Sequence, residues 1–450
     1  MEPYVDNVSD EPLIKEELMA KKIISEDDLE ELGTSRIVLE NGIEVYLKKT
    51  NFKNDEILFS AISHGGQSMY SEDDLPTIQF VDDIVGEAGI GNFDNTQLSK
   101  LLAGKTLAVS SYIGEYTEGV RGSCSPDDLE TFLQLVYLTF TAPRKDEKSF
   151  NSYISKEKSI YRNILSNPNY YFFDQVMKIS FDNNPRRRFP TVDDYDKLDL
   201  DRAIEIYKER FADANDFKFS IVGNFESSQM KELLAKYLGN LPVLEEAESY
   251  KSMNINYLDG TIEKDLSKGK APKTFVNMTY HGKMKYTKDE VFKLNMMAEV
   301  LKIRLRESMR EDKGGVYGVR VSASPSKIPE EQYSITISFN TDPAKAQELI
   351  ETAFQDIENT QNNATDEDTL NKVKETQRQE RIKSLKQNRF WNALLRNAFV
   401  NESDPNDIDL DFLEQSLQSL TGDDIKAAAN KYLDKNKFIK VVMSPESIGQ

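Results

Sequence analysis

The chain has 450 residues, 38% of them hydrophobic, which is enough for two or three globular domains with apolar cores. Its formal net charge of −20 excludes the basic surface that nucleic-acid binding requires. The charge predicts a solvated acidic surface, with attraction of basic peptides as the alternative. No stretch reaches about 18 uninterrupted apolar residues, so no membrane span is predicted. The polar start, Met1–Asp6, is typical of neither a signal peptide nor a transit peptide.

The first part of the chain shows a leader and then a hairpin. Residues 1–34 are charged and weakly periodic, which predicts a linker or leader segment with a short helix near Glu26–Leu32. Asn41-Gly42 stands between two strand-like runs and predicts a β-hairpin. A strand over Ile57–Ser63 then ends at His64-Gly65, before an apolar helix.

Three further features have local interpretations. Gly86, Gly89 and Gly91 end a helical pattern, and because no Lys-Ser or Lys-Thr follows them, they predict a turn rather than a phosphate-binding loop. The single cysteine, Cys124, excludes an internal disulfide and is expected to be a small buried hydrophobe. The basic run Arg186–Arg188 lies between two prolines and predicts a surface loop.

The same succession of elements occurs a second time. Asp259-Gly260 follows Asn41-Gly42 at an offset of 218 (260 minus 42) and predicts a second hairpin. A strand over Phe275–Tyr280 ends at His281, at an offset of 217 from His64 (281 minus 64). The helix and strand that begin at Leu198 and Phe217 are matched by a helix and strand at Leu420 and Phe438, with offsets of 222 and 221. Anchors in one order at nearly one offset predict an internal duplication.

The predicted fold class is α+β, with two tandem homologous domains. The first covers 35–240, residues 241–272 hold the linker and the start of the second repeat, and the second domain covers 253–450. Each is expected to be a mainly antiparallel sheet packed by helices, because alternating runs such as Tyr333–Phe339 accompany helical runs such as Phe292–Leu305. Residues 365–399 predict one long charged helix.

Four segments in this order resemble the pitrilysin–insulinase family, whose zinc enzymes carry the motif H-x-x-E-H. They are Leu39–Val45, the strand–helix unit after Gly65, Tyr207–Phe211 with Phe219–Gly223, and Arg310–Val319. The resemblance covers about residues 35–445. It implies half of a clamshell in which two halves, each of two homologous domains, close around a peptide, with zinc bound in the N-terminal half.

Departures from the family pattern identify which half this chain resembles. The positions of His, Glu and His in the family motif hold Gln79, Asp82 and Asp83, and the region of the third ligand, near Ile160, has no carboxylate among the nearest neighbours. Catalytic zinc needs about three protein ligands, so no metal is expected in this chain and zinc is expected in the partner half. Both histidines, His64 and His281, stand at equivalent repeat positions and are expected to be structural.

One pair keeps the family's residue types. Arg310 and Tyr317 flank the turn Lys313-Gly314-Gly315, and the resemblance implies that they bind the substrate carbonyl and its oxyanion across the chamber. Guanidinium and phenol groups supply the donors for this. The alternative is structural: Arg310 pairs with Glu311 or Asp312, and Tyr317 packs on a sheet.

The sequence therefore predicts a zinc-free C-terminal half of a pitrilysin-type metallopeptidase, inactive by itself. Its partners would be a zinc-bearing half, in the same polypeptide or a separate one, and a peptide substrate. The alternatives are a catalytically silent scaffold of the same fold and a peptide-binding subunit. The resemblance favours a bacterial periplasm or cell envelope over the cytoplasm.

Overall fold

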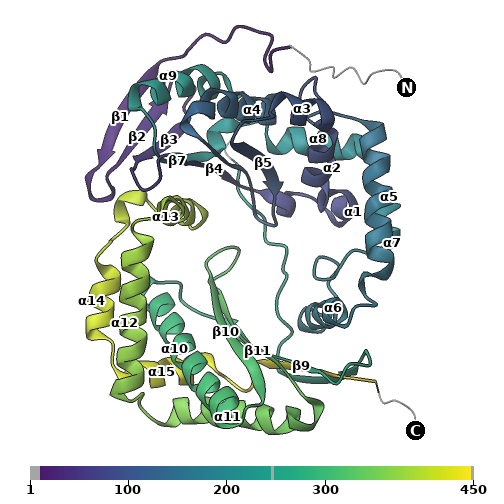
Figure 1. The fold of residues 1–450 in the computed structure, drawn as a ribbon, viewed down its shortest axis with the longest axis vertical. Helices are drawn as coiled ribbons and strands as arrows, with labels where there is room; N and C mark the ends of the chain where they lie inside the picture. Colours follow the sequence, from purple (N-terminus) through teal and green to yellow (C-terminus); the bar gives the residue numbers. More distant parts are fainter. Residues whose placement is uncertain (1–10, 245–247, 447–450) are drawn as a thin grey trace. The chain divides into compact units, whose positions relative to one another are not determined.

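The computed structural model describes residues 11–244 and 248–446, which form two compact units (Figure 1). The first unit draws on the chain up to Ser159, on Thr191–Met253 and on Lys383–Ile408. The second draws on Ile160–Pro190, Asn254–Ile382 and the chain from Asp409 onward. None of the helices in these described ranges is long and apolar enough to cross a membrane.

The first unit is built on a seven-stranded sheet in the order β1-β2-β3-β7-β4-β6-β5. All neighbours are antiparallel except β3 and β7, which are parallel. The strands, in sheet order, are β1 Ile23–Leu29, β2 Thr34–Leu39, β3 Glu44–Lys49, β7 Lys218–Gly223, β4 Ile57–His64, β6 Thr117–Cys124 and β5 Leu107–Ile113. The helices are α1 Leu75–Ile78, α2 Val81–Ala88, α3 Asn95–Leu101, α4 Leu129–Thr141, α5 Glu147–Ile164 (to Ser159), α7 Val192–Tyr195, α8 Leu200–Arg210, α9 Ser227–Tyr237 and α13 Asn388–Val400.

The second unit has a five-stranded sheet in the order β10-β11-β9-β12-β8. Its strands are β10 Val316–Ser326, β11 Gln332–Thr341, β9 Thr274–Lys283, β12 Phe438–Ser444 and β8 Thr261–Ser267. Its helices are α6 Pro168–Ser180, α10 Lys288–Arg306, α11 Ala346–Asn362, α12 Glu367–Ser384, α14 Phe412–Ser419 and α15 Gly422–Tyr432. Read from the other end, this order matches β3-β7-β4-β6-β5 strand for strand, including the one parallel pair at β8 and β12. The predicted α+β class with helix-packed, mainly antiparallel sheets is confirmed.

Strand register confirms the predicted equivalence of the two histidines. His64 of β4 pairs with Thr117 of β6, and His281 of β9 pairs with Ser334 of β11. The two histidines and their two partners have the same offset, 217 (281 minus 64 and 334 minus 117). The hairpin at Asn41-Gly42 is also confirmed: Gly42 has a φ of 87°, and its N–H donates to the carbonyl of Leu39 at 2.9 Å.

Two expectations for the repeat ends are wrong. The region of the predicted helix near Glu26–Leu32 is mainly the edge strand β1, followed by a single 3-10 turn, because its backbone pairs with β2. The second hairpin does not form, because the segment before Gly260 packs against the end of α6 instead of pairing. There the Leu258 N–H donates to the Ser180 carbonyl at 2.8 Å, and Tyr257 stacks on His281 at 4.8 Å.

The predicted single helix over 365–399 is two helices, α12 and α13, separated at residues 385–387. The chain changes unit at this break, since α12 packs in the second unit and α13 in the first. A matching break, at residues 165–167, separates α5 from α6. Each compact unit thus includes one helix from the other half of the sequence: α6 lies in the second unit and α13 in the first. The predicted ranges 35–240 and 253–450 describe sequence repeats and remain a prediction.

Helix α13 packs on β4 and β7 through a buried hydrogen-bond network. The Asn392 side chain donates to the Ser60 hydroxyl at 2.9 Å and accepts from the Ser220 hydroxyl at 3.0 Å. Asn388, 2% exposed, accepts from the Thr50 hydroxyl at 2.6 Å and donates to Glu56 at 2.9 Å. The sheet face under α13 is therefore polar at these positions.

The opposite face of the same sheet is aromatic. Because side chains alternate along a strand, the neighbours of Ser60 and Ser220 point the other way. Phe59 lies 5.5 Å from Phe132 of α4 and 6.0 Å from Phe219, ring centre to ring centre. In the second unit, α6 covers its sheet with apolar contacts instead, led by Phe172 against Phe275 at 5.4 Å.

We expect Asn388→Ala to destabilise the chain by about 1–3 kcal/mol, since it leaves the buried Thr50 hydroxyl without its acceptor. Chemical and thermal denaturation measure the change. Arg389→Ala is the matched control, because Arg389 is exposed on the same turn and its side chain donates to the nearby Gln387 side chain at 2.7 Å. Equal stability of the two variants would contradict a stabilising role for the network.

Candidate functional site

The three positions that correspond to the family's metal motif do not lie on one continuous helix. Gln79 is the residue after α1, whereas Asp82 and Asp83 lie in the first turn of α2. The helix break between them changes the relative direction of the side chains. Gly89 ends α2 with a φ of 94°, and a Cβ there would lie 2.2 Å from the Phe93 carbonyl, so the predicted glycine turn is confirmed.

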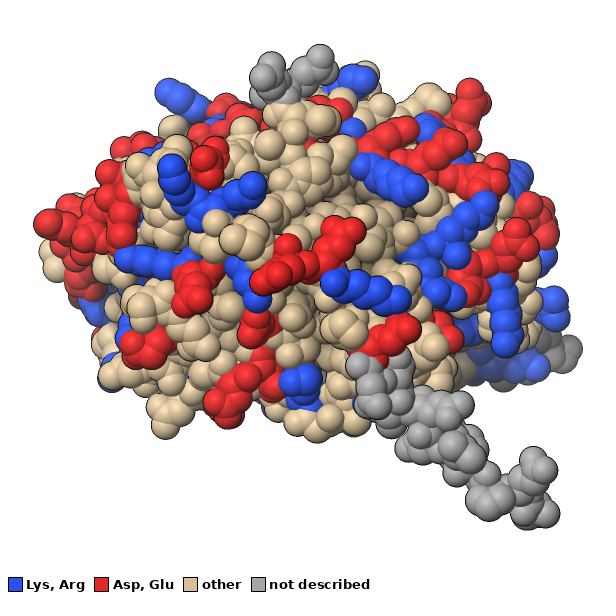
Figure 2. All heavy atoms as spheres, turned by 90° about the horizontal axis from the view of Figure 1, so that it is seen from above, with Lys and Arg blue, Asp and Glu red and all other residues tan. Residues whose placement is uncertain are grey.

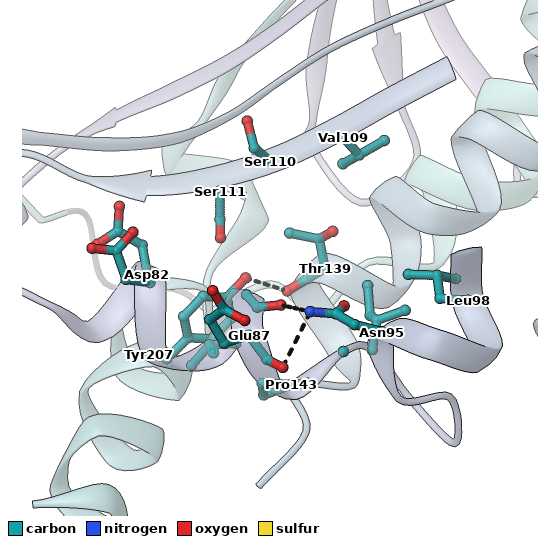
Figure 3. A pocket seen from close by; sticks show the side chains of 15 residues that line it. Asp82, Glu87, Asn95, Leu98, Val109, Ser110, Ser111, Thr139, Pro143 and Tyr207 are labelled. Atoms are coloured by element: carbon teal, nitrogen blue, oxygen red, sulfur yellow. Dashed lines mark hydrogen bonds between the residues drawn. The ribbon is translucent and has the colours of Figure 1, made fainter. Parts of the chain in front are cut away.

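A cavity of about 440 Å³ opens beside Asp82 and Asp83 (Figure 3). It is bounded by α2, by the segment that leads into α3, by β5, and by residues of α4 and α8. The lining residues with polar side chains are Asp82, Asp83, Glu87, Asn95, Ser110, Ser111, Thr139 and Tyr207.

Hydrogen bonds fix the walls of this cavity. The Asn95 side chain donates to the carbonyls of Gly86 and Glu87 at 3.0 and 3.1 Å, which caps the end of α2. The Tyr207 hydroxyl donates to the Thr139 carbonyl at 3.0 Å and joins α8 to α4. Both interactions are drawn as dashed lines in Figure 3.

The cavity is acidic. Burial, and then the neighbouring charge of Asp83, raise the pKa of Asp82 to about 6. Burial also raises the pKa of Asp83, and the Tyr153 hydroxyl, 3.3 Å from its carboxylate, opposes this. Lys156 lies 3.2 Å from Glu87. The side of the cavity nearest Asp82 thus holds carboxylates whose charge is only partly compensated.

These residues do not fit zinc. Asp82 and Asp83 are the only members of the motif that supply carboxylates, and Gln79 does not line the cavity. Within residues 11–244 and 248–446, no three His, Cys, Asp or Glu side chains are grouped so that they could hold a metal ion. A catalytic zinc site needs about three such ligands.

A buried ion network beside the site was not expected from the sequence. Glu118, 2% exposed, accepts the Gly66 N–H and lies 3.6 Å from Arg210, whose guanidinium also contacts Glu248 at 2.6 Å. Burial raises the pKa of Glu118 to about 7, and Arg210 opposes this shift. The network fixes the turn at Gly65 and Gly66, which leads from β4 toward α1. The one sequence feature that could have indicated this ion network is Arg210, which stands in a segment that resembles the family.

The two histidines have structural surroundings. The His64 ring nitrogen Nε2 is 3.0 Å from the Val400 carbonyl, which fastens the end of α13 to β4. His281 is 4% exposed and stacks on Tyr257. Burial lowers the pKa of His281.

Arg310 and Tyr317 lie in the second unit, on either side of an irregular turn. Arg310 is exposed within a π-helical segment, Glu307–Asp312, that extends α10. The N–H of Gly314 donates to the Arg310 carbonyl at 3.1 Å, so the chain folds back on the helix end. Tyr317 is the second residue of β10, inside a register shift between Val316 and Val319. Glu311, the proposed structural partner of Arg310, lies 4.0 Å from Arg306.

Comparisons with known proteins agree with this geometry. Residues 197–377 match the profile of the Peptidase M16 inactive domain. The chain is 23% identical over 406 residues to the zinc protease PQQL-like protein of Arabidopsis thaliana, a match that covers 85% of this chain and 40% of that protein. It is 22% identical over 418 residues to the probable zinc protease PqqL of Haemophilus influenzae, covering 90% and 43%. The periplasmic protease PqqL from Escherichia coli has a similar fold, with a TM-score of 0.82, 17% identity and coverage of 98% and 49%.

Residues 197–377 thus match the inactive domain of the M16 peptidases. The chain as a whole is similar to one half of the PqqL-type zinc proteases, which supports a non-catalytic half of a pitrilysin-type protease. It spans less than half the length of the two sequence relatives.

We expect Asp82→Asn to stabilise the chain near neutral pH. The folded chain holds the Asp82 proton more tightly than the unfolded chain, so stability falls as pH rises from about 4 to about 6 and then stays level. The variant removes this loss, worth about 1–3 kcal/mol at pH 7.5. Melting temperatures at pH 4 and pH 7.5 measure it, with exposed Asp73→Asn as control. A variant less stable than wild type at pH 7.5 would rule this out.

We also expect the chain to retain no zinc. After dialysis against micromolar zinc, elemental analysis should find far less than one ion per chain, because the motif positions lack the ligands. One tightly held zinc per chain would refute the assignment of these positions.

Proposed function

We propose that this chain closes the peptide chamber of a two-half zinc peptidase and presents Arg310 and Tyr317 to the substrate. A partner half would bind the zinc and carry out hydrolysis. The observation that carries the proposal is the exposed Arg310 at the end of α10, held next to the start of β10 by a glycine turn.

The local irregularities support a functional turn. Single π-turns inside helices and bulges in strands occur often at functional sites, since each changes the direction of a side chain. Here a π-helical segment holds Arg310, and the register shift of β10 holds Tyr317. Gly315, in the turn between them, packs closely on Leu349, because a Cβ there would lie 2.7 Å from the Leu349 side chain.

The chemistry suits a carbonyl that gains negative charge. A guanidinium offers several donors in a fixed plane, and a phenol offers one more. Donors held in place before the reaction stabilise an oxyanion without reorganisation. A peptide is therefore the expected substrate, by analogy with the zinc proteases to which the chain is similar.

A periplasmic or cell-envelope location fits this function, because the Escherichia coli protein of similar fold is described as periplasmic. Acidic and basic side chains alternate over the face shown in Figure 2, which suits a solvated surface. A silent scaffold and a free peptide-binding subunit are the competing functions, and the variants below separate them from the proposed one.

We expect Tyr317→Phe to lower peptide turnover by about 10²–10³-fold in the chain assembled with its zinc-bearing half, since one oxyanion donor is lost. Arg310→Lys keeps the charge but loses the planar donor set, and should also reduce turnover. The double variant should lose less than the product of the two, because both donors serve one oxygen.

Arg306→Lys is the matched control, because Arg306 is exposed one turn earlier on the same helix end. Melting temperatures exclude a folding defect. Turnover of Tyr317→Phe within about twofold of wild type, in an active assembly, would argue for a scaffold or a simple binding subunit.

A further inference from the structure

A segment without helix or strand, residues 248–253, is attached to the first unit through its backbone and is called the strap. The Glu248 N–H donates to the Asp216 carboxylate at 3.3 Å. The Lys251 N–H donates to the Ser68 hydroxyl at 3.1 Å. Side chains of the first unit therefore hold the backbone of the strap, in place of a neighbouring strand.

One aromatic side chain of the strap also packs on the first unit. The ring centre of Tyr250 lies 5.8 Å from that of His64 and 6.0 Å from that of Tyr116. Tyr250 nevertheless stays partly exposed. The apolar area that the strap buries is therefore limited, and its polar contacts decide how firmly it is held.

An ion pair anchors the strap. Both carboxylate oxygens of Glu248 contact the guanidinium of Arg210, at 2.6 and 2.9 Å. Arg210 is the last residue of α8 and its side chain is 6% exposed, whereas the side chain of Glu248 is 36% exposed. A guanidinium that holds a carboxylate through two bonds makes one of the stronger charged contacts in proteins. The docked position of the strap thus depends on the charge around Arg210.

The same guanidinium faces a second carboxylate, which is buried. Glu118 of β6 is 2% exposed and lies 3.6 Å from Arg210. The titratable side chains around this pair include Tyr70, Tyr112, Asp213, Asp216 and Glu248. Several carboxylates therefore share one guanidinium, and Glu118 competes with Glu248 for it.

Protonation of Glu118 decides this competition. Burial raises the pKa of Glu118 to about 7, Arg210 opposes the shift, and the charge of Glu248 adds to it. Because docked Glu248 favours the protonated form of Glu118, ionised Glu118 must disfavour docking by the same free energy. Burial, and then the charge of Asp213, raise the pKa of Asp216 to about 6. Asp216 acts in both directions, since it repels the Glu248 carboxylate but accepts the Glu248 N–H.

We propose that the strap is a proton-controlled latch, docked while Glu118 is protonated and released when ionised Glu118 takes Arg210 from Glu248. Release alters the wall of a cavity of about 520 Å³, because two residues that contact the strap, His64 and Asp216, line it. All of these groups lie in the first unit. The latch needs neither zinc nor a partner half, so it holds or fails independently of the proposed function.

Trypsin cleavage after Lys251 measures release, because the strap must leave the unit before a protease can bind it. The full chain and the free peptide Glu-Ser-Tyr-Lys-Ser-Met, which has the sequence of the strap, are cleaved at pH 6 and pH 8.5. Each rate for the chain is divided by the rate for the peptide at the same pH. If the released state gives Glu118 an ordinary pKa of about 4.3, docking weakens about tenfold over this range. We therefore expect the relative cleavage rate to be about tenfold higher at pH 8.5.

Two variants test the assigned groups. Glu118→Gln keeps an acceptor for the Gly66 N–H but cannot ionise, so its strap should resist cleavage at both pH values. Glu248→Gln weakens the anchor, and its relative cleavage rate at pH 6 should exceed that of wild type about tenfold. Glu232→Gln, exposed on α9, is the matched control and should behave as wild type.

Three results would overturn the proposal. They are a wild-type relative rate that is equal at the two pH values, a pH dependence that persists in folded Glu118→Gln, and resistance of Glu248→Gln equal to that of wild type at pH 6. Should Glu118→Gln fail to fold, the first and third results still decide. Circular dichroism at both pH values excludes unfolding of the whole chain as the source of cleavage.

Discussion

Two asparagines of α13 hold together a unit whose segments are far apart in the sequence. Asn388 and Asn392, late in the chain, bond to two hydroxyls and a carboxylate near its beginning, those of Thr50, Ser60 and Glu56. Each buried bond adds only about 1 kcal/mol, but a missing partner costs more, so the set specifies where the helix lies. The other face of the sheet packs against the aromatic core, and this core supports the helices around the cavity.

Local signals predicted the elements that depend on local chemistry. Asn41-Gly42 requires a left-handed turn, and the runs at β4, β7 and β12 are too apolar to be anything but buried strands. Where tertiary structure decides, the sequence was insufficient. Pro168 marks the break before α6. Residues 385–387 contain neither glycine nor proline, so no local signal in the sequence marks the break between α12 and α13. β1 has the charges of a loop because both of its faces meet solvent at an edge.

In the candidate sites, too, the sequence predicted the residues but not the contacts that depend on tertiary structure. The resemblance located Gln79, Asp82 and Asp83, and it predicted that they lack a metal ligand set. It could not predict the cavity, since its walls come from β5, α4 and α8, and its key contact uses the backbone of Ile113. A main-chain hydrogen bond has no residue signature. Burial and the charge of Asp83 raise the pKa of Asp82, so its ionised carboxylate is expected to lower the stability of the folded chain near neutral pH.

The exchange of helices also has a consequence during synthesis. The other segments of the first unit are synthesised by Met253, whereas α13 begins at Asn388, about 135 residues later (388 minus 253). At about 5–20 residues per second, the ribosome needs roughly 7–27 s to deliver it. During that interval the uncovered sheet face meets water, and the hydroxyls of Ser60 and Ser220 can bond to water there. The interface also has an apolar contact, Tyr46 against Phe399 at 5.0 Å. Its polar positions reduce the apolar area that is exposed before the helix arrives, and a wholly apolar face would promote aggregation of the nascent chain more strongly.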